Sequence, residues 1–395
     1  MATGTEKTTR LGSIDVWRGI ACLMVVVDHA GFALNGSEAA IGGIEGSLRT
    51  LVVGGFRLAL GPPIFFVISG YCVATSIASA RRKGTTPWAF LGRRFWRIVP
   101  TYWVALIGFV AVIAALDLAG SSRLYDGPNG LGLSTPSSLT RAQWIGNITL
   151  TETWRPFYLP GSVPSVFTRI AWTLCYQEQF YAVSALVWAL FAGRWFRGLG
   201  IVTIGCAAVS AFFWDTGAQH RVEGLFLDYW HEFAVGLAVY WRLERAETTR
   251  AKRGIELGLL ALAIVAAFAN PRSTVVAALF GLILIRTQGW NAKLDGIRAL
   301  NPIRACGRRC YSIYLVHLPF CAIGGRLLIG LGLESFWARS LIVIPAVSAV
   351  SVAMSWAFYA VIETKFIGTP KPGKFATLVQ HLILRPHRSG SVVNA

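Results

Sequence analysis

Long apolar segments alternate with short basic connections along most of the chain. A membrane-spanning α-helix needs roughly 20 mostly apolar residues, and segments of about this length recur throughout. The pattern predicts an all-α, polytopic transmembrane helical bundle of about ten spans, of which the seventh and eighth are short enough to form one hairpin. The predicted spans are 13–34, 58–79, 96–118, 167–192, 198–214, 226–242, 255–269, 273–288, 311–331 and 338–362.

The Lys and Arg residues fall on alternate connections, which is the positive-inside pattern that sets the orientation of membrane proteins. With the N-terminus in the cytoplasm, every predicted inner segment is basic, and the outer connections hold scattered Arg and no Lys. Both termini are therefore predicted to be cytoplasmic. We expect a transmembrane domain over residues 1–365, with a long outer loop at about 120–166, and a short basic tail over 366–395.

The composition supports a membrane protein and argues against other classes. Hydrophobic residues make up 54% of the chain, charged residues 14%, and the mean hydropathy is +0.54. The net charge of +18 is spread between apolar segments rather than gathered in one patch, so no nucleic-acid partner is expected. Seven scattered Cys without regular spacing predict neither a disulfide framework nor a metal site. No small-residue cleavage site follows the first apolar run, so it is expected to stay in the mature protein.

Two ionisable residues of the first span, Arg18 and His29, share one helix face. They lie eleven residues apart, which is about three helical turns and a rise of about 16 Å. Ionisable residues within a span indicate a functional site, and this separation is close to the length of a phosphopantetheine arm. Alternatively, Arg18 is an ordinary positive-inside anchor, and His29 is a core histidine bonded to a neighbouring helix.

Three further polar residues lie inside predicted spans. Glu178 is near the middle of the fourth span, where an unpaired carboxylate would be costly, so it belongs to a site or to a structural ion pair. Ser69 of the second span is interpreted as a packing hydroxyl rather than a nucleophile. His317 of the ninth span is interpreted equally well as a structural or as a site residue.

Five motifs in one order carry a resemblance to a known family. The chain resembles the integral-membrane acyltransferase-3 family, whose members O-acylate polysaccharides, lipid-linked glycans and some small molecules. In that family an Arg or Lys precedes a His by ten intervening residues, as Arg18 precedes His29. Cys175-Tyr176-Gln177 departs from the commoner wording of its motif, and the esterase-like domain of many relatives is not expected here. The motifs are Ile14–Ala21 with His29, Phe65–Tyr71, Arg93–Pro100, Trp172–Tyr181 and Tyr311–His317.

The resemblance implies roles for particular residues of this chain. Acyl-CoA is the expected co-substrate, with its phosphates held by guanidinium groups, whose forks match phosphate geometry. His29 is the expected general base or transient acyl carrier, oriented or charge-stabilised by Glu178. The expected phosphate-binding residues are Arg18, Arg93, Arg94 and Arg97. The expected substrate-binding or supporting residues are Ser69, Tyr71, Trp172, Tyr181 and His317.

The function implied is transfer of an acyl group, with acetyl favoured, from cytosolic acyl-CoA to a hydroxyl of a cell-envelope or exported glycan. The protein is expected in the bacterial inner membrane, with no permanently bound cofactor and with the bilayer, acyl-CoA and the acceptor as partners. The main alternative is a transporter or flippase with Arg, His and Glu along its path, although no inverted repeat is present. A sensor or scaffold is a third class. The acceptor and the oligomeric state are left open.

Overall fold

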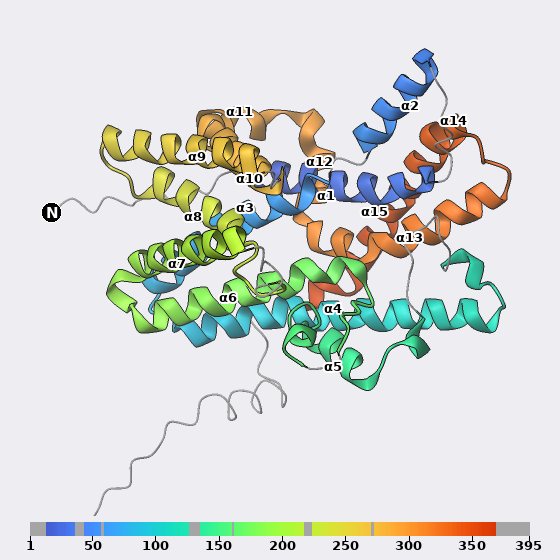
Figure 1. Ribbon diagram of the computed structural model, residues 1–395, viewed down its shortest axis with the longest axis horizontal. Helices are drawn as coiled ribbons and strands as arrows, with labels where there is room; N and C mark the ends of the chain where they lie inside the picture. Colours follow the sequence, from blue (N-terminus) through green and yellow to red (C-terminus); the bar gives the residue numbers. More distant parts are fainter. Residues whose placement is uncertain are drawn as a thin grey trace, which may run out of the picture.

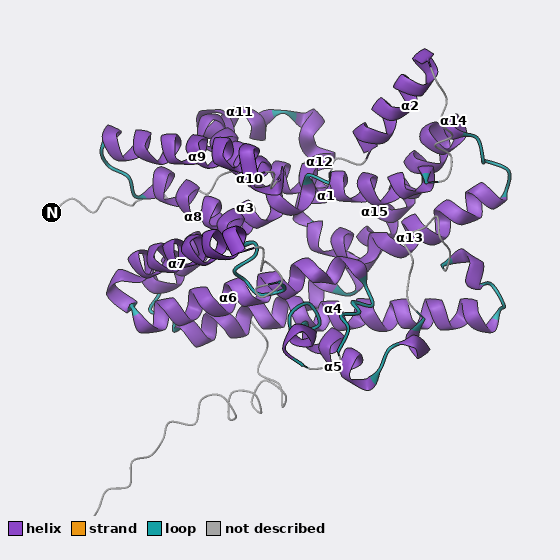
Figure 2. Cartoon of the chain, viewed as in Figure 1, coloured by secondary structure: helices purple, strands orange, loops and turns teal. Residues whose placement is uncertain are grey.

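The computed structural model describes residues 13–35, 43–56, 59–125, 135–159, 162–216, 223–269 and 272–368. Within these ranges the chain is helical and contains no strand, so the predicted all-α bundle is confirmed (Figure 2). Most of the predicted tail, from residue 369 onward, lies outside the described residues.

The helices are arranged as a bundle in which segments distant in sequence lie side by side (Figure 1). The longer helices are α1 (Ile14–Ala30), α2 (Gly43–Phe56), α3 (Gly61–Arg82), α4 (Pro87–Leu118), α5 (Arg141–Thr149), α6 (Trp172–Leu190), α7 (Trp195–Thr216), α8 (Trp230–Glu244), α9 (Thr249–Ala269), α10 (Arg272–Thr287), α12 (Asn301–Arg308), α13 (Cys310–Gly330) and α15 (Ile344–Val361). The short ones include η1 (Gly31–Leu34), η5 (Arg169–Ala171), α11 (Asn291–Gly296), α14 (Phe336–Ala338), the π-helix η10 (Arg339–Val343) and η11 (Glu363–Phe366).

All ten predicted spans coincide with helices, but fewer of them are long and apolar enough to cross a bilayer. Six helical segments in the described part of the chain meet that requirement, and a seventh does if α6 and α7, bent by 118° at their junction, form one span. Two predicted spans fall short for clear reasons: α8 has only 15 residues, and α9 begins with the charged residues Arg250, Lys252 and Arg253. The protein is thus a multi-pass membrane protein.

Helix α4 begins earlier than the pattern predicted, and this moves Arg93 and Arg94 from a connection onto a helix. The predicted span started at residue 96, whereas α4 starts at Pro87, where the Thr86 side chain accepts a hydrogen bond from the Ala89 N–H. A Thr cap followed by Pro at the first helical position favours helix initiation. Arg93, Arg94 and Arg97 therefore project from the first turns of α4 at fixed angles.

The predicted outer loop contains ordered structure that is tied together by buried polar contacts. The side chain of Thr140 accepts from the backbone of Gln143 at the start of α5, in a reciprocal capping box. Glu152 is 1% exposed, pairs with Arg155 at 2.6 Å and accepts from the Ser165 N–H at 3.1 Å. The described part of this loop is consequently a packed cap on the bundle rather than an extended connection.

Two apolar cores lie within the bundle, and α1 contributes to both. The first gathers mainly residues of α3, α6, α8 and α10, and the second mainly residues of α4, α13 and α15. Helices α3 and α8 approach closely because Gly70 and Gly236 face each other: a Cβ on Gly70 would lie 2.0 Å from the Phe233 carbonyl oxygen. Helix α1 crosses α12 in a similar way, with Gly307 against the Asp15 carbonyl oxygen.

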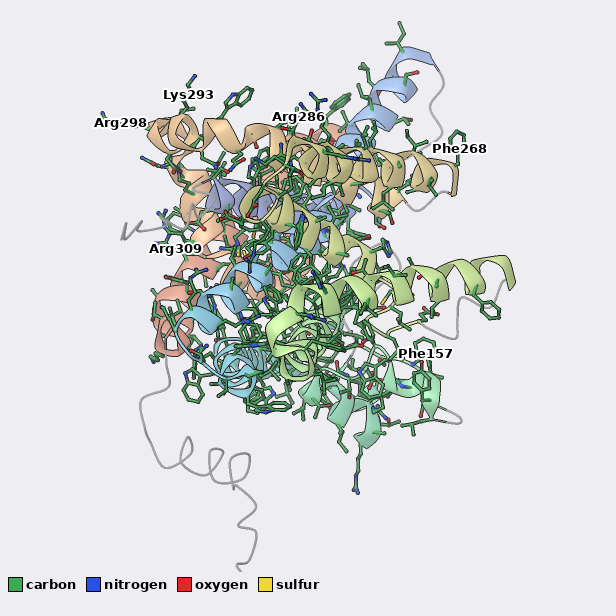
Figure 3. The ribbon with its side chains drawn as sticks, turned by 90° about the vertical axis from the view of Figure 1, so that its left-hand side faces the viewer. Phe157, Phe268, Arg286, Lys293, Arg298 and Arg309 are labelled. Atoms are coloured by element: carbon green, nitrogen blue, oxygen red, sulfur yellow. The ribbon has the colours of Figure 1, made fainter. Side chains whose placement is uncertain are left out.

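Residues that the charge pattern assigns to opposite sides of the membrane lie on opposite sides of the bundle. Lys293, Arg298 and Arg309, which the charge pattern assigns to the cytoplasm, lie on one side of the molecule in Figure 3. Phe157, from the predicted outer loop, and Phe268, at the outer end of the predicted span 255–269, lie on the opposite side. This separation is the one expected if each of these groups meets water or headgroups on its own side of a bilayer.

Candidate functional site

A basic cavity of about 1110 Å³ lies among α1, α3, α4, α6 and α13. Its volume slightly exceeds the range typical of small-molecule sites, so a large ligand fits. Within the described residues its lining holds seven cationic side chains against two carboxylates, Asp15 and Glu244. The cations are Arg18, Arg82, Lys83, Arg93, Arg94, Arg97 and Arg308. Such a balance favours a ligand with several negative charges.

The wall formed by α3 is a polar stripe on an otherwise apolar helix. Ser69, Cys72, Ser76, Ser79 and Lys83 all line the cavity. Their spacing alternates between three and four residues, which keeps them on one helix face. The hydroxyl and thiol groups therefore point into the same space that the arginines enter from other helices.

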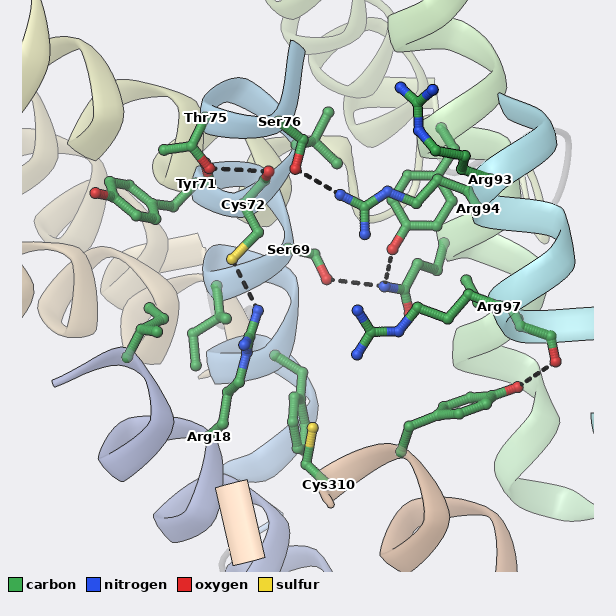
Figure 4. A pocket seen from close by; sticks show the side chains of 18 of the residues that line it. Arg18, Ser69, Tyr71, Cys72, Thr75, Ser76, Arg93, Arg94, Arg97 and Cys310 are labelled. Carbon is green, nitrogen blue, oxygen red and sulfur yellow. Dashed lines mark hydrogen bonds between the residues drawn. The ribbon is translucent and has the colours of Figure 1, made fainter. Parts of the chain in front are cut away.

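Arg18 enters this space from α1 and contacts the α3 stripe. Its Nη2 donates to Cys72 Sγ at 2.9 Å, and its Nη1 lies 3.4 Å from Asp15 Oδ1 (Figure 4). About 23% of the side chain remains exposed. The guanidinium is thus held in place with part of its donor capacity still directed at the cavity.

The arginines of α4 approach from the opposite wall. Arg94 donates to Ser76 Oγ at 2.6 Å and lies over the ring of Tyr181, with 5.2 Å between its Cζ and the ring centroid. In Figure 4 the side chains of Arg18, Arg94 and Arg97 converge on the cavity, whereas the guanidinium of Arg93 is turned away from them.

Gln177 links two residues that were predicted to support the site. Its amide Nε2 donates to Ser69 Oγ at 3.1 Å and to the Tyr181 hydroxyl at 2.5 Å. Because Ser69 is on α3 and Gln177 and Tyr181 are on α6, the amide bridges two walls of the cavity. In the sequence, Gln177 stands out only as a departure from a family motif, and its alignment with Thr173 and Tyr181 at four-residue spacing is the signal that could have identified it.

His29 is paired with His317 rather than with Glu178. The two imidazoles lie on α1 and α13, with 3.3 Å between His317 Nε2 and His29 Nδ1 and 5.0 Å between ring centroids. His317 is fully buried, whereas His29 is half-buried. Phe32 stacks on His29, with 6.2 Å between ring centroids.

The cavity ends one aromatic ring away from this histidine pair. Tyr314 lines the cavity and lies 6.1 Å from the His317 ring and 6.1 Å from the Phe65 ring, centroid to centroid. The Tyr314 hydroxyl is anchored by hydrogen bonds of 2.5 Å to Thr173 Oγ1 and to the Ile170 carbonyl oxygen. Phe65 and Tyr314 therefore form the boundary between the basic cavity and the two imidazoles.

The remaining predicted site residues, Glu178, Trp172 and Tyr71, differ in their relation to the cavity. Glu178 interacts electrostatically with Arg94, and among the described residues it makes no contact with His29, so its predicted role in orienting His29 has no geometric support. Trp172 packs in an aromatic cluster with Phe66 and Tyr229 instead of lining the cavity. Tyr71 does line it, although its side chain is only 2% exposed.

Comparison with known proteins identifies the class to which this geometry belongs. Residues 11–360 match the sequence model of the family described as the acyltransferase domain, type 3. The chain belongs to the acyltransferase-3 family. The match includes α1 with its Arg18–His29 pair, the basic helix α4 and the His317 helix α13, so the predicted membership is confirmed and the chain is a membrane acyltransferase.

Two curated relatives are similar over most of this acyltransferase. It is 27% identical over 338 residues to BcsY of Komagataeibacter xylinus, which carries the name of a membrane-bound transacylase, covering 81% of this chain and 75% of that protein. It is 24% identical over 360 residues to the peptidoglycan O-acetyltransferase OatA of Listeria monocytogenes, covering 80% of this chain but only 51% of OatA. No solved structure matches the chain significantly.

Proposed function

We propose that this acyltransferase moves an acyl group, acetyl in the first instance, from acyl-CoA to a hydroxyl group of a cell-envelope or exported glycan. One observation carries the proposal: a cavity with seven cations ends at Tyr314 and Phe65, directly beside His29 and His317. A polyanionic donor with a long uncharged arm would fill a space of this kind, with phosphates among the arginines and the thioester toward the imidazoles.

The donor enters from the basic side of the bundle, which the charge pattern assigns to the cytoplasm. Arg18, Arg94 and Arg97 converge on the cavity and are the first candidates to bind the phosphates of CoA. Arg18 lies about 16 Å below His29 along α1, since eleven residues rise by that distance. The pantetheine arm spans this interval, so the thioester arrives near His29 while the nucleotide stays among the arginines.

His29 acts as the general base in the transfer step. Its imidazole accepts the proton of the acceptor hydroxyl while that oxygen attacks the thioester carbonyl carbon, forming a C–O bond. Collapse of the tetrahedral intermediate breaks the C–S bond, and His29 returns the proton to the departing thiolate. The products are the O-acyl ester and CoA with a free thiol, so the step needs no other reactant.

Two findings support a glycan hydroxyl as acceptor. The relative OatA is named for O-acetylation of peptidoglycan, which is a glycan of the cell envelope. The ordered outer loop also exposes Phe157, on the side opposite the basic end, and the adjacent Tyr158, and aromatic faces of this kind suit stacking on sugar rings. Both curated relatives come from bacteria, which supports the bacterial cytoplasmic membrane as the location.

The proposal is tested with the purified full-length protein in lipid nanodiscs. With labelled acetyl-CoA and peptidoglycan fragments, the wild type is expected to release free thiol and to transfer label to the glycan. His29→Ala is expected to abolish both, whereas His231→Ala, which changes a histidine bonded to Thr274 at 2.7 Å outside the cavity, retains both. Full transfer by His29→Ala refutes the role of His29, and absence of thiol release from the wild type favours the transporter alternative.

A further inference from the structure

The hydrogen bonds of the histidine pair determine which ring nitrogens carry protons. His29 Nδ1 lies 2.8 Å from the carbonyl oxygen of Val25, and His317 Nδ1 lies 2.9 Å from that of Ile313. A carbonyl oxygen can only accept, so both Nδ1 atoms must be donors. In two neutral rings the protons are therefore on Nδ1, and each Nε2 has a free lone pair.

The contact between the rings agrees with this assignment. His317 Nε2 lies 3.3 Å from His29 Nδ1, so an unprotonated Nε2 accepts a second, shared hydrogen bond from the Nδ1–H of His29. A protonated Nε2 on His317 would instead place two donors against each other. The one consistent arrangement leaves Nε2 of His29 without a proton, which is the state required of a general base.

We propose that His317 is a positioning residue that accepts a hydrogen bond from Nδ1 of His29 and thereby stabilises the imidazolium formed when Nε2 takes up the acceptor proton. This inference rests on the proposed function, since it explains how His29 acts within it. His317 takes the place that a buried carboxylate occupies in many acyl-transfer enzymes, but as a neutral acceptor. Full burial prevents His317 from contacting the substrate, whereas the half-buried His29 has an accessible edge.

Contacts along α1 and α13 hold the two rings in register. Cys22 Sγ donates to the Cys310 carbonyl oxygen at 3.7 Å, seven residues before His29 and His317 respectively. Seven residues are about two helical turns, so parallel helices in contact at the first pair are also in contact at the second. Cys321 Sγ donates to the Val26 carbonyl oxygen at 3.8 Å, which fixes the same interface from the other helix.

Substitutions at position 317 leave the other charged neighbours of His29 in place. Asp28 and Arg169 act on its imidazole electrostatically and in opposite directions, and His317 is the remaining titratable group in contact with it. Tyr314 lies next to His317 but is engaged with Thr173 and Ile170. A difference between substitutions at position 317 therefore reports on the acceptor supplied there.

Gln and Met at position 317 form a matched pair for the test, because they have similar length and shape but only Gln has a good acceptor oxygen. His317→Met is expected to lower kcat roughly 10-fold without changing the KM for acetyl-CoA, since a hydrogen bond to the imidazolium is lost. His317→Gln is expected to stay within about 3-fold of the wild type. Equal losses of kcat in the two variants would mean that His317 only fills space, and would overturn the proposal.

A spectroscopic measurement on the wild type decides the hydrogen bonding without any turnover. In histidine-labelled protein, the ¹⁵N signals of His29, identified by their loss in His29→Ala, are expected to show a protonated Nδ1 and an unprotonated Nε2. The opposite tautomer refutes the role of His317 even if transfer occurs. Absence of transfer by the wild type refutes the proposed function instead, so the two failures are distinguishable.

Discussion

Replacing Arg18 with Gln removes one cation from the wall of the basic cavity while keeping a polar side chain of similar direction. Arg18 bonds to Cys72 at 2.9 Å, lies 3.4 Å from Asp15 and has 23% of its side chain exposed. A hydrogen bond to a charged group contributes about 1.5–3 kcal/mol. Solvent and the Asp15 carboxylate screen the bond between Arg18 and a phosphate of acetyl-CoA, so the low end of that range applies.

The expected consequence is an increase in the KM for acetyl-CoA of about tenfold, because about 1.4 kcal/mol corresponds to a factor of ten in an equilibrium constant. The kcat should change much less, since Arg18 lies about three helical turns from His29. The difference in KM between Arg18→Gln and the wild type should also shrink in high salt, because ions screen contacts between exposed charges and phosphates.

Initial rates of thiol release from the purified protein, at a series of acetyl-CoA concentrations, provide the assay. Arg298→Gln is the matched control, since Arg298 is exposed and does not line the cavity. An unchanged KM in Arg18→Gln, with normal expression, would refute phosphate binding by this residue. Arg18 would then be the ordinary positive-inside anchor that its position in the sequence also allows.

Two further substitutions test the packing and the protonation of the same end of the bundle. Gly307→Ala puts a Cβ 1.7 Å from the Asp15 carbonyl oxygen, so we expect a loss of stability of about 1–3 kcal/mol and a lower melting temperature. Gly92→Ala is the control, because nothing lies within 4 Å of its added Cβ, and it should melt at the same temperature as the wild type. Equal melting temperatures of the wild type and both variants would contradict the close crossing of α1 and α12. Burial raises the pKa of Glu363 above its ordinary 4.5, against the opposing effect of hydrogen bonds from Ser312. The folded protein keeps this proton where the unfolded chain has released it, so the associated stability is present below about pH 4.5 and is lost as the pH rises through the raised pKa. Glu363→Gln stays neutral, so its melting temperature should rise relative to that of the wild type as the pH increases. If the melting temperatures of the two proteins changed with pH in parallel, Glu363 would not be the source of the pH dependence.

Much of the architecture was predictable because its determinants are local. The hydropathy of each segment predicted where helices would lie, and helical periodicity placed Arg18 and His29 on one face of α1. The early start of α4 was also present in local signals, the cap residue Thr86 and Pro87, but the density of arginines favoured a connection instead. The bend of 118° between α6 and α7 leaves no comparable trace in a hydropathy pattern, which explains why two spans were predicted where the structure allows one bent span.

The partners of each site residue were not predictable, because they depend on which helices touch. His29 was expected to lie near Glu178, but α13 packs on α1 and brings His317, 288 positions away in sequence, against it. Glu178 faces Arg94 from α6 instead. Any of several apolar helices could have packed on α1. The choice depends on complementary surfaces, such as Gly19 and Gly307, which allow the close approach of α1 and α12.

By itself, the sequence determined that this chain forms an all-α membrane bundle of the acyltransferase-3 family, with a cation and an imidazole at two levels of its first helix. Hydrophobicity and helical period are properties of neighbouring residues, so they survive in a linear pattern. The tertiary structure alone decided that seven cations of the described residues line one cavity and that His317 lies against His29. Those relations are set by close packing between distant segments, where an approach of a few ångströms selects one neighbour over another.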